Sequence, residues 1–151
     1  MSINTLVKGL QSEIFVPVTP PPVWTEVNKD IKDMKLALVT AAGVHLKSDE
    51  KFNLAGDFTF RRIPGDVSTD ELMVTHGGYD NADANRDINC MFPLKRVQEL
   101  EKEGFIKKIA SSHYGFMGGG GDQAKLREET GPAIARLLKE DGVDAVLMTA
   151  G

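Results

Sequence analysis

Lys35-Leu36-Ala37-Leu38-Val39-Thr40 is an almost unbroken apolar run, and Ala41-Ala42-Gly43 follows it directly. Strands that are buried on both faces of a parallel sheet read as continuous apolar runs, whereas strands with one solvated face alternate. A glycine directly after such a run is a common turn signal. We therefore predict a buried parallel strand over residues 35–40.

Four further segments downstream of this run are predicted to be strands. Residues 58–63 partly alternate and end at Pro64-Gly65, which is typical of a strand at a sheet edge. Residues 72–76 form a strand closed by two glycines, and residues 105–110 form a weak one. Residues 145–148 are predicted to be a buried strand that completes a βαβ unit.

Helices are predicted over residues 93–103, 122–129 and 132–141. A proline begins the first and third of these segments, and Asp122 is a suitable N-cap for the second. Glycines at positions 104 and 142 end the first and third. Because strands and helices alternate, we predict an α/β fold with a mainly parallel, Rossmann-like sheet, helices on its faces and an incomplete C-terminus.

Composition and proline content divide the chain and exclude several classes of protein. Residues 1–34 are predicted to be a proline-rich arm, and residues 35–151 the N-terminal part of an α/β domain. A net charge of −4 argues against nucleic-acid binding, and we expect no membrane span, because no apolar stretch reaches about 18 residues. One cysteine, Cys90, permits no internal disulfide and fits a reducing cytoplasm.

The densest polar segment covers residues 75–89 and follows a predicted strand, as functional loops often do. As a calcium loop it fails, since Ile88 stands where glycine is needed and Leu94 where the bidentate glutamate is needed. Two interpretations remain open. Its side chains either cap turns and the next helix or face a substrate or partner, with His76 and Asp80 as the most reactive groups.

Two other histidines lie near predicted strand ends. His113 belongs to a segment that runs into four glycines, which either expose N–H groups to an anion or form a flexible loop. His45 follows the first predicted strand. None of the histidines has a ligand partner at short spacing, so we predict no metal site. Cys90 stands among apolar residues, which is typical of an inert core cysteine.

The sequence ends at Gly151, two residues after the last predicted strand. In open α/β sheets, reactive groups lie just beyond the carboxyl ends of the strands. We therefore expect this strand tip, with Thr149, to border a reactive position. A UGA codon read as a stop, or a boundary chosen by hand, would each explain the ending.

Several strings resemble segments of the glycine/sarcosine/betaine/D-proline reductase selenoprotein family, and together they cover residues 36–151. They are Thr40-Ala41-Ala42-Gly43-Val44-His45-Leu46-Lys47-Ser48, Val74-Thr75-His76, Asp83-Ala84-Asn85-Arg86-Asp87-Ile88-Asn89 with Phe92-Pro93-Leu94, His113-Tyr114-Gly115-Phe116-Met117-Gly118, and Leu138-Lys139-Glu140-Asp141-Gly142-Val143-Asp144-Ala145-Val146-Leu147-Met148-Thr149. The resemblance implies that selenocysteine follows directly after Gly151. The short lead-in before that position is similar to the D-proline-reducing members.

The resemblance implies a reductive ring opening of D-proline to 5-aminovalerate in a cytoplasmic hetero-oligomer. The implied partners are a pyruvoyl-containing subunit that binds the proline nitrogen and an electron carrier protein. The sequence has no selenocysteine, and Cys90 does not stand at the family's reactive position, so residues 1–151 alone are expected to bind no cofactor and to be inactive. The alternatives are a B-type subunit of glycine, sarcosine or betaine reductase, or a noncatalytic module that binds a ligand or partner.

Eight residues are candidates for the site. Those for proton transfer or carboxylate recognition are His76, Asp80 and His113, and those for substrate contact are His45, Tyr79, Asp83, Tyr114 and Thr149.

Overall fold

Strand β1 (Lys35–Thr40) is the centre of a five-stranded sheet. The computed structural model describes residues 25–119 and 122–150. Along one edge β1 pairs in parallel with β7 (Ala145–Thr149), and along the other with β5 (Lys108–Ile109) and then β6 (Ser112–Phe116). β3 (Phe60–Pro64) pairs with β6 in the antiparallel direction and forms an outer edge.

A second, two-stranded antiparallel sheet consists of β2 (Val44–Leu46) and β4 (Leu72–Val74). The predicted α/β class is confirmed, but a mainly parallel, Rossmann-like sheet is not, because the main sheet is mixed and the predicted strand 72–76 lies outside it. The predicted strand at 105–110 shortens to β5. The edge position predicted for residues 58–63 is confirmed by β3.

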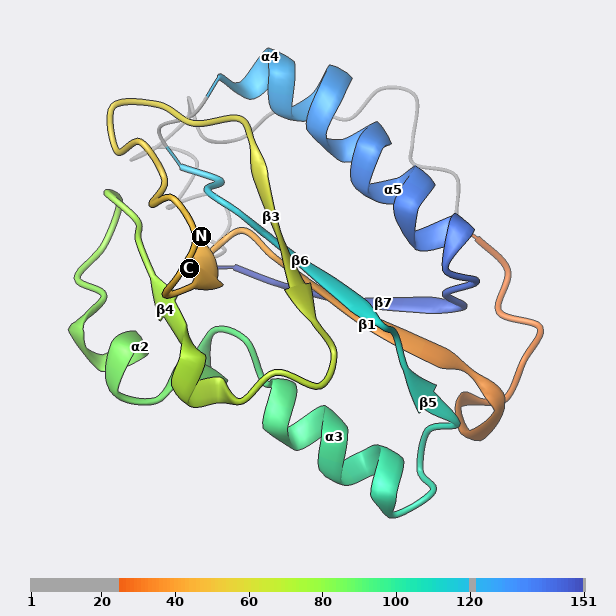
Figure 1. Cartoon of the computed structure of the whole chain (residues 1–151). Helices are drawn as coiled ribbons and strands as arrows, with labels where there is room; N and C mark the ends of the chain where they lie inside the picture. Colours follow the sequence, from red (N-terminus) through yellow and green to blue (C-terminus); the bar gives the residue numbers. More distant parts are fainter. Residues whose placement is uncertain (1–24, 120–121, 151) are drawn as a thin grey trace, which may run out of the picture.

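Helices cover β1 on both faces of the sheet, as Figure 1 shows. Leu38 packs in a core with Leu94 and Val97 of α3 (Leu94–Lys102). On the other face, Val39 packs with Ile134 and Leu138 of α5 (Gly131–Glu140). Shorter helical segments complete the described fold: η2 (Ile31–Asp33), η3 (Thr69–Glu71), α2 (Ala82–Arg86) and η4 (Ile88–Cys90).

The two helices predicted between residues 122 and 141 are one continuous helical segment. Asp122 caps it by accepting a hydrogen bond from the backbone of Lys125. α4 (Gln123–Lys125) passes through a π-helical turn (Leu126–Thr130) into α5. That wide turn ends two residues before Pro132, whose missing N–H prevents regular i→i−4 bonding, so the proline distorts the helix without ending it.

Strand β7 forms as predicted, but it is not buried in the described chain. The exposed fractions are 40% for Val146, 41% for Leu147 and 65% for Met148. The prediction of a buried strand is therefore wrong for this part of the molecule. Its physical reason is that β7 has only one neighbouring strand among the described residues and neither helical layer covers it.

Most of the predicted proline-rich arm lies outside the described residues. Near its end, Lys29 forms an ion pair of 2.8 Å with Asp144, and Asp144 also accepts a hydrogen bond from the backbone of Lys35. None of the helices in the described ranges is long and apolar enough to cross a membrane.

Gly115 permits the close crossing of β2 over β6. A Cβ atom at this position would lie 2.0 Å from the carbonyl oxygen of Val44, so Gly115→Ala would force two backbone segments apart. We expect the free energy of unfolding to fall by about 3 kcal/mol, as in severe overpacking. Urea denaturation measures this, with Gly77→Ala as the control, because a Cβ there meets only ordinary contacts. Equal stability of the two variants would contradict the packing described.

Candidate functional site

The carboxyl ends of β1, β6 and β7 meet at one edge of the sheet, because these strands run in the same direction. The backbone N–H of Ala41 donates to the carbonyl of Thr149 at 3.0 Å, and the N–H of Gly118 donates to the carbonyl of Ala41 at 2.9 Å. The three strand tips are thus joined directly. Ligands of open α/β sheets bind at such carboxyl edges.

The carbonyl of Met91 fixes two of these strand tips. It accepts a hydrogen bond of 2.6 Å from the hydroxyl of Thr149 and one of 3.3 Å from the hydroxyl of Thr40. The Thr40 hydroxyl in turn accepts from the backbone N–H of Ala42 at 3.2 Å. The tip of β7 is therefore held in a defined place beside the end of β1.

His76 and Tyr79 reach the same edge from the loop after β4. Their rings lie 4.8 Å apart, and the Tyr79 hydroxyl donates to the carbonyl of Ala42 at 2.9 Å. His76 Nδ1 accepts from the N–H of Gly78, so the proton of the neutral ring is on Nε2. Burial lowers the pKa of His76, which favours this neutral form. A Cβ on Gly119 would lie 3.3 Å from the His76 ring, which places the ring against the segment that follows β6.

The two acidic candidates that follow His76 face solvent, whereas Asn81 and Asn85 bond to the backbone of His76 and Val74. Asp80 is exposed and accepts from the N–H of Ala82, and Asp83 forms an exposed ion pair of 2.9 Å with Arg86. Cys90 is exposed, so the prediction of a core cysteine is wrong. The short turn η4 buries Ile88, and Cys90 lies at the other end of that turn.

His113 lies inside strand β6 and is fully buried. Its Nδ1 accepts a hydrogen bond of 3.0 Å from the backbone N–H of Leu38. This side chain therefore gives β1 a hydrogen-bond acceptor beyond the end of its pairing with β5. Its Nε2 is buried with no hydrogen-bond partner among the described residues. Burial lowers the pKa of His113 from 6.5 to about 4, and the charge of Asp141 only partly opposes this. The contacts of His113 are those of a structural residue.

Tyr114, next to His113 in β6, belongs to the core shared with α5. Its ring packs edge-on against Phe60 at 5.6 Å, and burial raises the pKa of its hydroxyl. The side chain is 2% exposed. The geometry therefore assigns Tyr114 to packing between the sheet and the helix.

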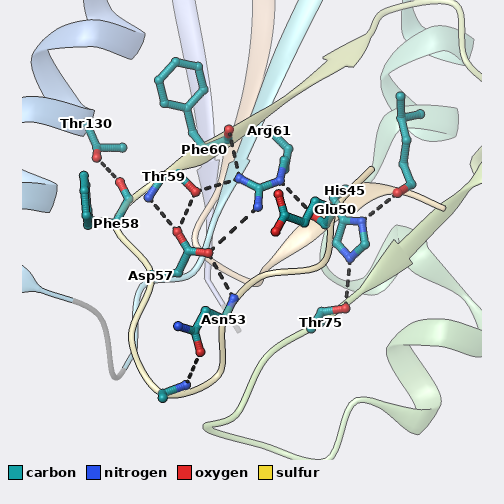
Figure 2. Close-up of polar contacts among 12 residues, drawn as sticks. His45, Glu50, Asn53, Asp57, Phe58, Thr59, Phe60, Arg61, Thr75 and Thr130 are labelled. Carbon is teal, nitrogen blue, oxygen red and sulfur yellow. Dashed lines mark hydrogen bonds and ion pairs between the residues drawn. The ribbon is translucent and has the colours of Figure 1, made fainter. Parts of the chain in front are cut away.

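His45 lies in β2, fully buried, and not in a loop. Its Nδ1 lies 2.6 Å from the carbonyl of Leu46, and its Nε2 lies 2.9 Å from the hydroxyl of Thr75. A carbonyl can only accept, so Nδ1 carries the proton and the Thr75 hydroxyl donates to Nε2. Burial is the main cause that lowers the pKa of His45. A base with an oriented ring and a hydroxyl donor is chemically suited to proton transfer, and Figure 2 shows the pair.

Sequence reasoning missed the polar network beside His45. Asp57 accepts from the N–H of Asn53 and from both the N–H and the hydroxyl of Thr59, and Arg61 lies 3.9 Å away (Figure 2). Burial works against ionisation of Asp57, but the bonds from Thr59 and Asn53 outweigh it and lower its pKa. The spacing of Asp57 and Thr59 is that of a local turn in which a side chain accepts from the backbone two residues on, which was the available signal.

The guanidinium of Arg61 is also occupied by protein groups. It donates to the carbonyl of Glu50 and to the hydroxyl of Thr59, and it lies 4.4 Å from the centre of the Phe52 ring. Because its donors have partners, Arg61 attaches the loop between β2 and β3 to the sheet.

The described ranges contain several cavities, among them a polar one of about 540 Å³ along α2, η4 and the start of α3, but no cluster of metal ligands. A cavity of about 620 Å³, lined in part by Gln98, Lys102 and Ile109, lies near the start of β1, away from the carboxyl edge. In residues 25–119 and 122–150, no three His, Cys, Asp or Glu side chains are placed to hold a metal ion. Of the eight candidates, His76, Tyr79 and Thr149 converge at the carboxyl edge.

Comparison with known proteins identifies the family. The family model of glycine/sarcosine/betaine reductase selenoprotein B matches residues 2–151. The chain belongs to this selenoprotein B family. The family resemblance given by the motifs is therefore confirmed.

Curated relatives differ in similarity and in length. The chain is 70% identical to D-proline reductase subunit gamma of Acetoanaerobium sticklandii over 151 residues, which is all of the chain but 62% of that relative. It is 33% identical to glycine reductase complex component B subunit gamma of Carboxydothermus hydrogenoformans and to sarcosine reductase complex component B subunit beta of Peptoclostridium acidaminophilum, over 99% of the chain and 36% of each relative. The chain therefore spans less than two thirds of these relatives. No solved structure is significantly similar to it.

Replacing either of the two threonines at this edge of the selenoprotein B domain leaves different backbone groups without a hydrogen-bond partner. Thr149→Val removes one donor to the Met91 carbonyl, which keeps the Thr40 hydroxyl, so we expect a loss of about 1 kcal/mol of unfolding free energy. Thr40→Val also leaves the buried N–H of Ala42 unpaired and should cost about 2 kcal/mol. Urea unfolding of both variants measures the difference, and the reverse order would contradict the arrangement.

The buried His113 makes stability depend on pH. Its pKa is about 4 in the folded chain and 6.5 when unfolded, so between these values the unfolded chain binds more protons. The contribution of neutral His113 to the free energy of unfolding is fully present above pH 6.5. It should fall by roughly 3 kcal/mol as the pH drops to 4. Denaturation at several pH values measures this. In His113→Gln the contribution should disappear, while those of His45 and His76 remain. Superimposable profiles of the wild type and His113→Gln would contradict the assignment.

Proposed function

We propose that this chain is the N-terminal part of the selenoprotein subunit of a D-proline reductase, which opens the ring of D-proline reductively to 5-aminovalerate. The observation that carries the proposal is the identity of 70% along the whole chain to D-proline reductase subunit gamma, against 33% to glycine and sarcosine reductase subunits. A selenocysteine directly after Gly151 is part of the proposal. So are a cytoplasmic location and the assembly with a pyruvoyl-containing D-proline reductase subunit and an electron carrier protein.

The carboxyl edge of the sheet supports this placement of the reactive residue. The tip of β7 is held by the hydrogen bond from Thr149 to Met91 and by the bond from Ala41 to the Thr149 carbonyl. When the end of a strand is anchored in this way, the residues that follow it have less conformational freedom. Thr149 is therefore proposed to position the reactive group without contacting the substrate.

In this proposal selenocysteine supplies the nucleophile and the partner's pyruvoyl group activates the ring C–N bond. The described residues would bind and orient the substrate around them. His76 is buried, neutral and has its Nε2–H without a partner among the described residues, so it can donate a hydrogen bond to the substrate carboxylate. Tyr79 fixes the plane of the His76 ring through their stacking contact.

The remaining candidates take other roles in the proposal. Asp80, on the loop after β4, and Asp83, in α2 directly after it, are exposed and are proposed to face the partner subunit. His113 and Tyr114 support β1 and α5 from within the core. His45 is proposed to be a base paired with Thr75. Contact between His45 and the substrate would require an opening between β2 and β4.

Turnover by the full-length complex tests the proposed substrate. The complex, with selenocysteine incorporated, should release 5-aminovalerate from D-proline and show no turnover of glycine, sarcosine or betaine. His76→Phe should raise KM for D-proline about tenfold or more through the lost hydrogen bond, whereas His76→Gln, which keeps an N–H donor, should recover part of it. Product analysis and steady-state kinetics measure both.

The exposed ion pair provides the matched control for the loop. Asp83→Asn changes a solvent-facing charge in α2, directly after this loop, and should leave KM for D-proline unchanged. Turnover of glycine in place of D-proline would overturn the proposed substrate, and equal KM values for His76→Phe and the wild type would overturn the role of His76.

A further inference from the structure

Strand β7 has apolar side chains exposed on both faces of the sheet. Its register with β1 places Leu147 beside Leu38, on the face covered by α3, and Met148 beside Val39, on the face covered by α5. Leu38 and Val39 are 1% and 4% exposed, whereas Leu147 and Met148 are 41% and 65% exposed. Each helical layer therefore reaches β1 and stops before β7.

The two outer strands of the sheet differ in chemistry. β3 includes Arg61, Arg62 and Pro64, which are the residues that natural edge strands use to prevent further pairing. β7 reads Ala-Val-Leu-Met-Thr and contains no charge and no proline. A strand that is apolar on both faces has the composition of an interior parallel strand. β3 is thus built as a permanent edge, and β7 is not.

Building on the proposed function, in which the chain is the N-terminal part of a longer subunit, we propose that β7 is an interior strand of that subunit, covered by the part of the same polypeptide that follows residue 151. That segment would add a strand along the free edge of β7 and place helices over Leu147 on one face and Met148 on the other. More than a third of D-proline reductase subunit gamma lies outside the matched portion, since the chain covers 62% of it. A parallel crossover needs only a dozen or more residues. A segment of more than a third of the relative is therefore long enough to add a strand and covering helices.

Methionine oxidation in the wild-type, full-length subunit tests the covering directly. The subunit is purified alone, treated with dilute hydrogen peroxide and analysed by peptide mass spectrometry. Met117, which is 0% exposed, and Met34, which is 8% exposed, serve as internal references for buried side chains. Met148 should be oxidised as slowly as these two and about tenfold or more slowly than in urea. Oxidation of Met148 close to its unfolded rate would overturn the proposal.

Two other occupants are distinguished in the same measurement. If the protection of Met148 disappears when a dimer is diluted to monomers, a second copy covers β7 and the proposal is wrong. If protection arises only after the partner subunits are added, the partner covers β7 and the proposal is equally wrong. Protection in an isolated monomer at all concentrations supports it.

Substitutions on the two faces provide an independent test in the full-length subunit. Leu147→Asp and Met148→Asp should each lower the thermal unfolding midpoint by several degrees, because each would bury a charge. Leu54→Asp is the matched control, since Leu54 is 56% exposed and lies far from β7 in the sequence. Midpoints for all three within a degree of the wild type would overturn the proposal. A variant that fails to fold leaves the oxidation result decisive, and no readout depends on turnover of D-proline.

Discussion

The central strand β1 needs a hydrogen-bond partner along both edges, and the rest of the sheet is arranged to supply one. On one side β7 pairs with it from Leu36 to Thr40. On the other side β5 ends before β6 begins, and in the interval the His113 ring accepts from the N–H of Leu38. A buried N–H without an acceptor would cost about 1–3 kcal/mol. The side chain therefore permits β5 and β6 to be separate strands, with β6 free to pair also with β3 on its other edge.

Local sequence signals were sufficient to predict the features that depend only on neighbouring residues. The run from residue 35 to 40, the stops at Gly104 and Gly142 and the cap at Asp122 depend on neighbouring residues, and all of them hold in the structure. Strand pairing depends on distant residues, so the separate sheet of β2 and β4 could not be read from the sequence. The burial of β7 was also predicted wrongly. Its apolar sequence indicates a buried strand, whereas the described residues provide it with only one neighbouring strand.

The candidate site could be predicted only in part, for a related reason. The rule that ligands bind at the carboxyl ends of parallel strands pointed to Thr149, and the structure has this residue at that edge. It did not separate His76, whose ring reaches that edge, from His113, whose ring is used inside the sheet. The two differ in their partners, since one accepts from a nearby loop N–H and the other from a distant strand. The sequence does not contain that information in any local pattern.

The exposed strand and the anchored strand tip are two aspects of one arrangement. The hydrogen bonds of Thr149 and Ala41 hold the tip of β7 against β1 and Met91, but its side chains contribute little burial to the described chain. Hydrogen bonds of this kind stabilise by only about 1 kcal/mol each, whereas full burial of a Leu or Met side chain contributes about 1.5–3 kcal/mol. The hydrogen bonds therefore fix where the strand tip lies, whereas most of the stabilisation still available to β7 would come from burial of its side chains. In the proposed subunit, covering β7 would therefore stabilise the same strand whose tip positions the proposed reactive residue.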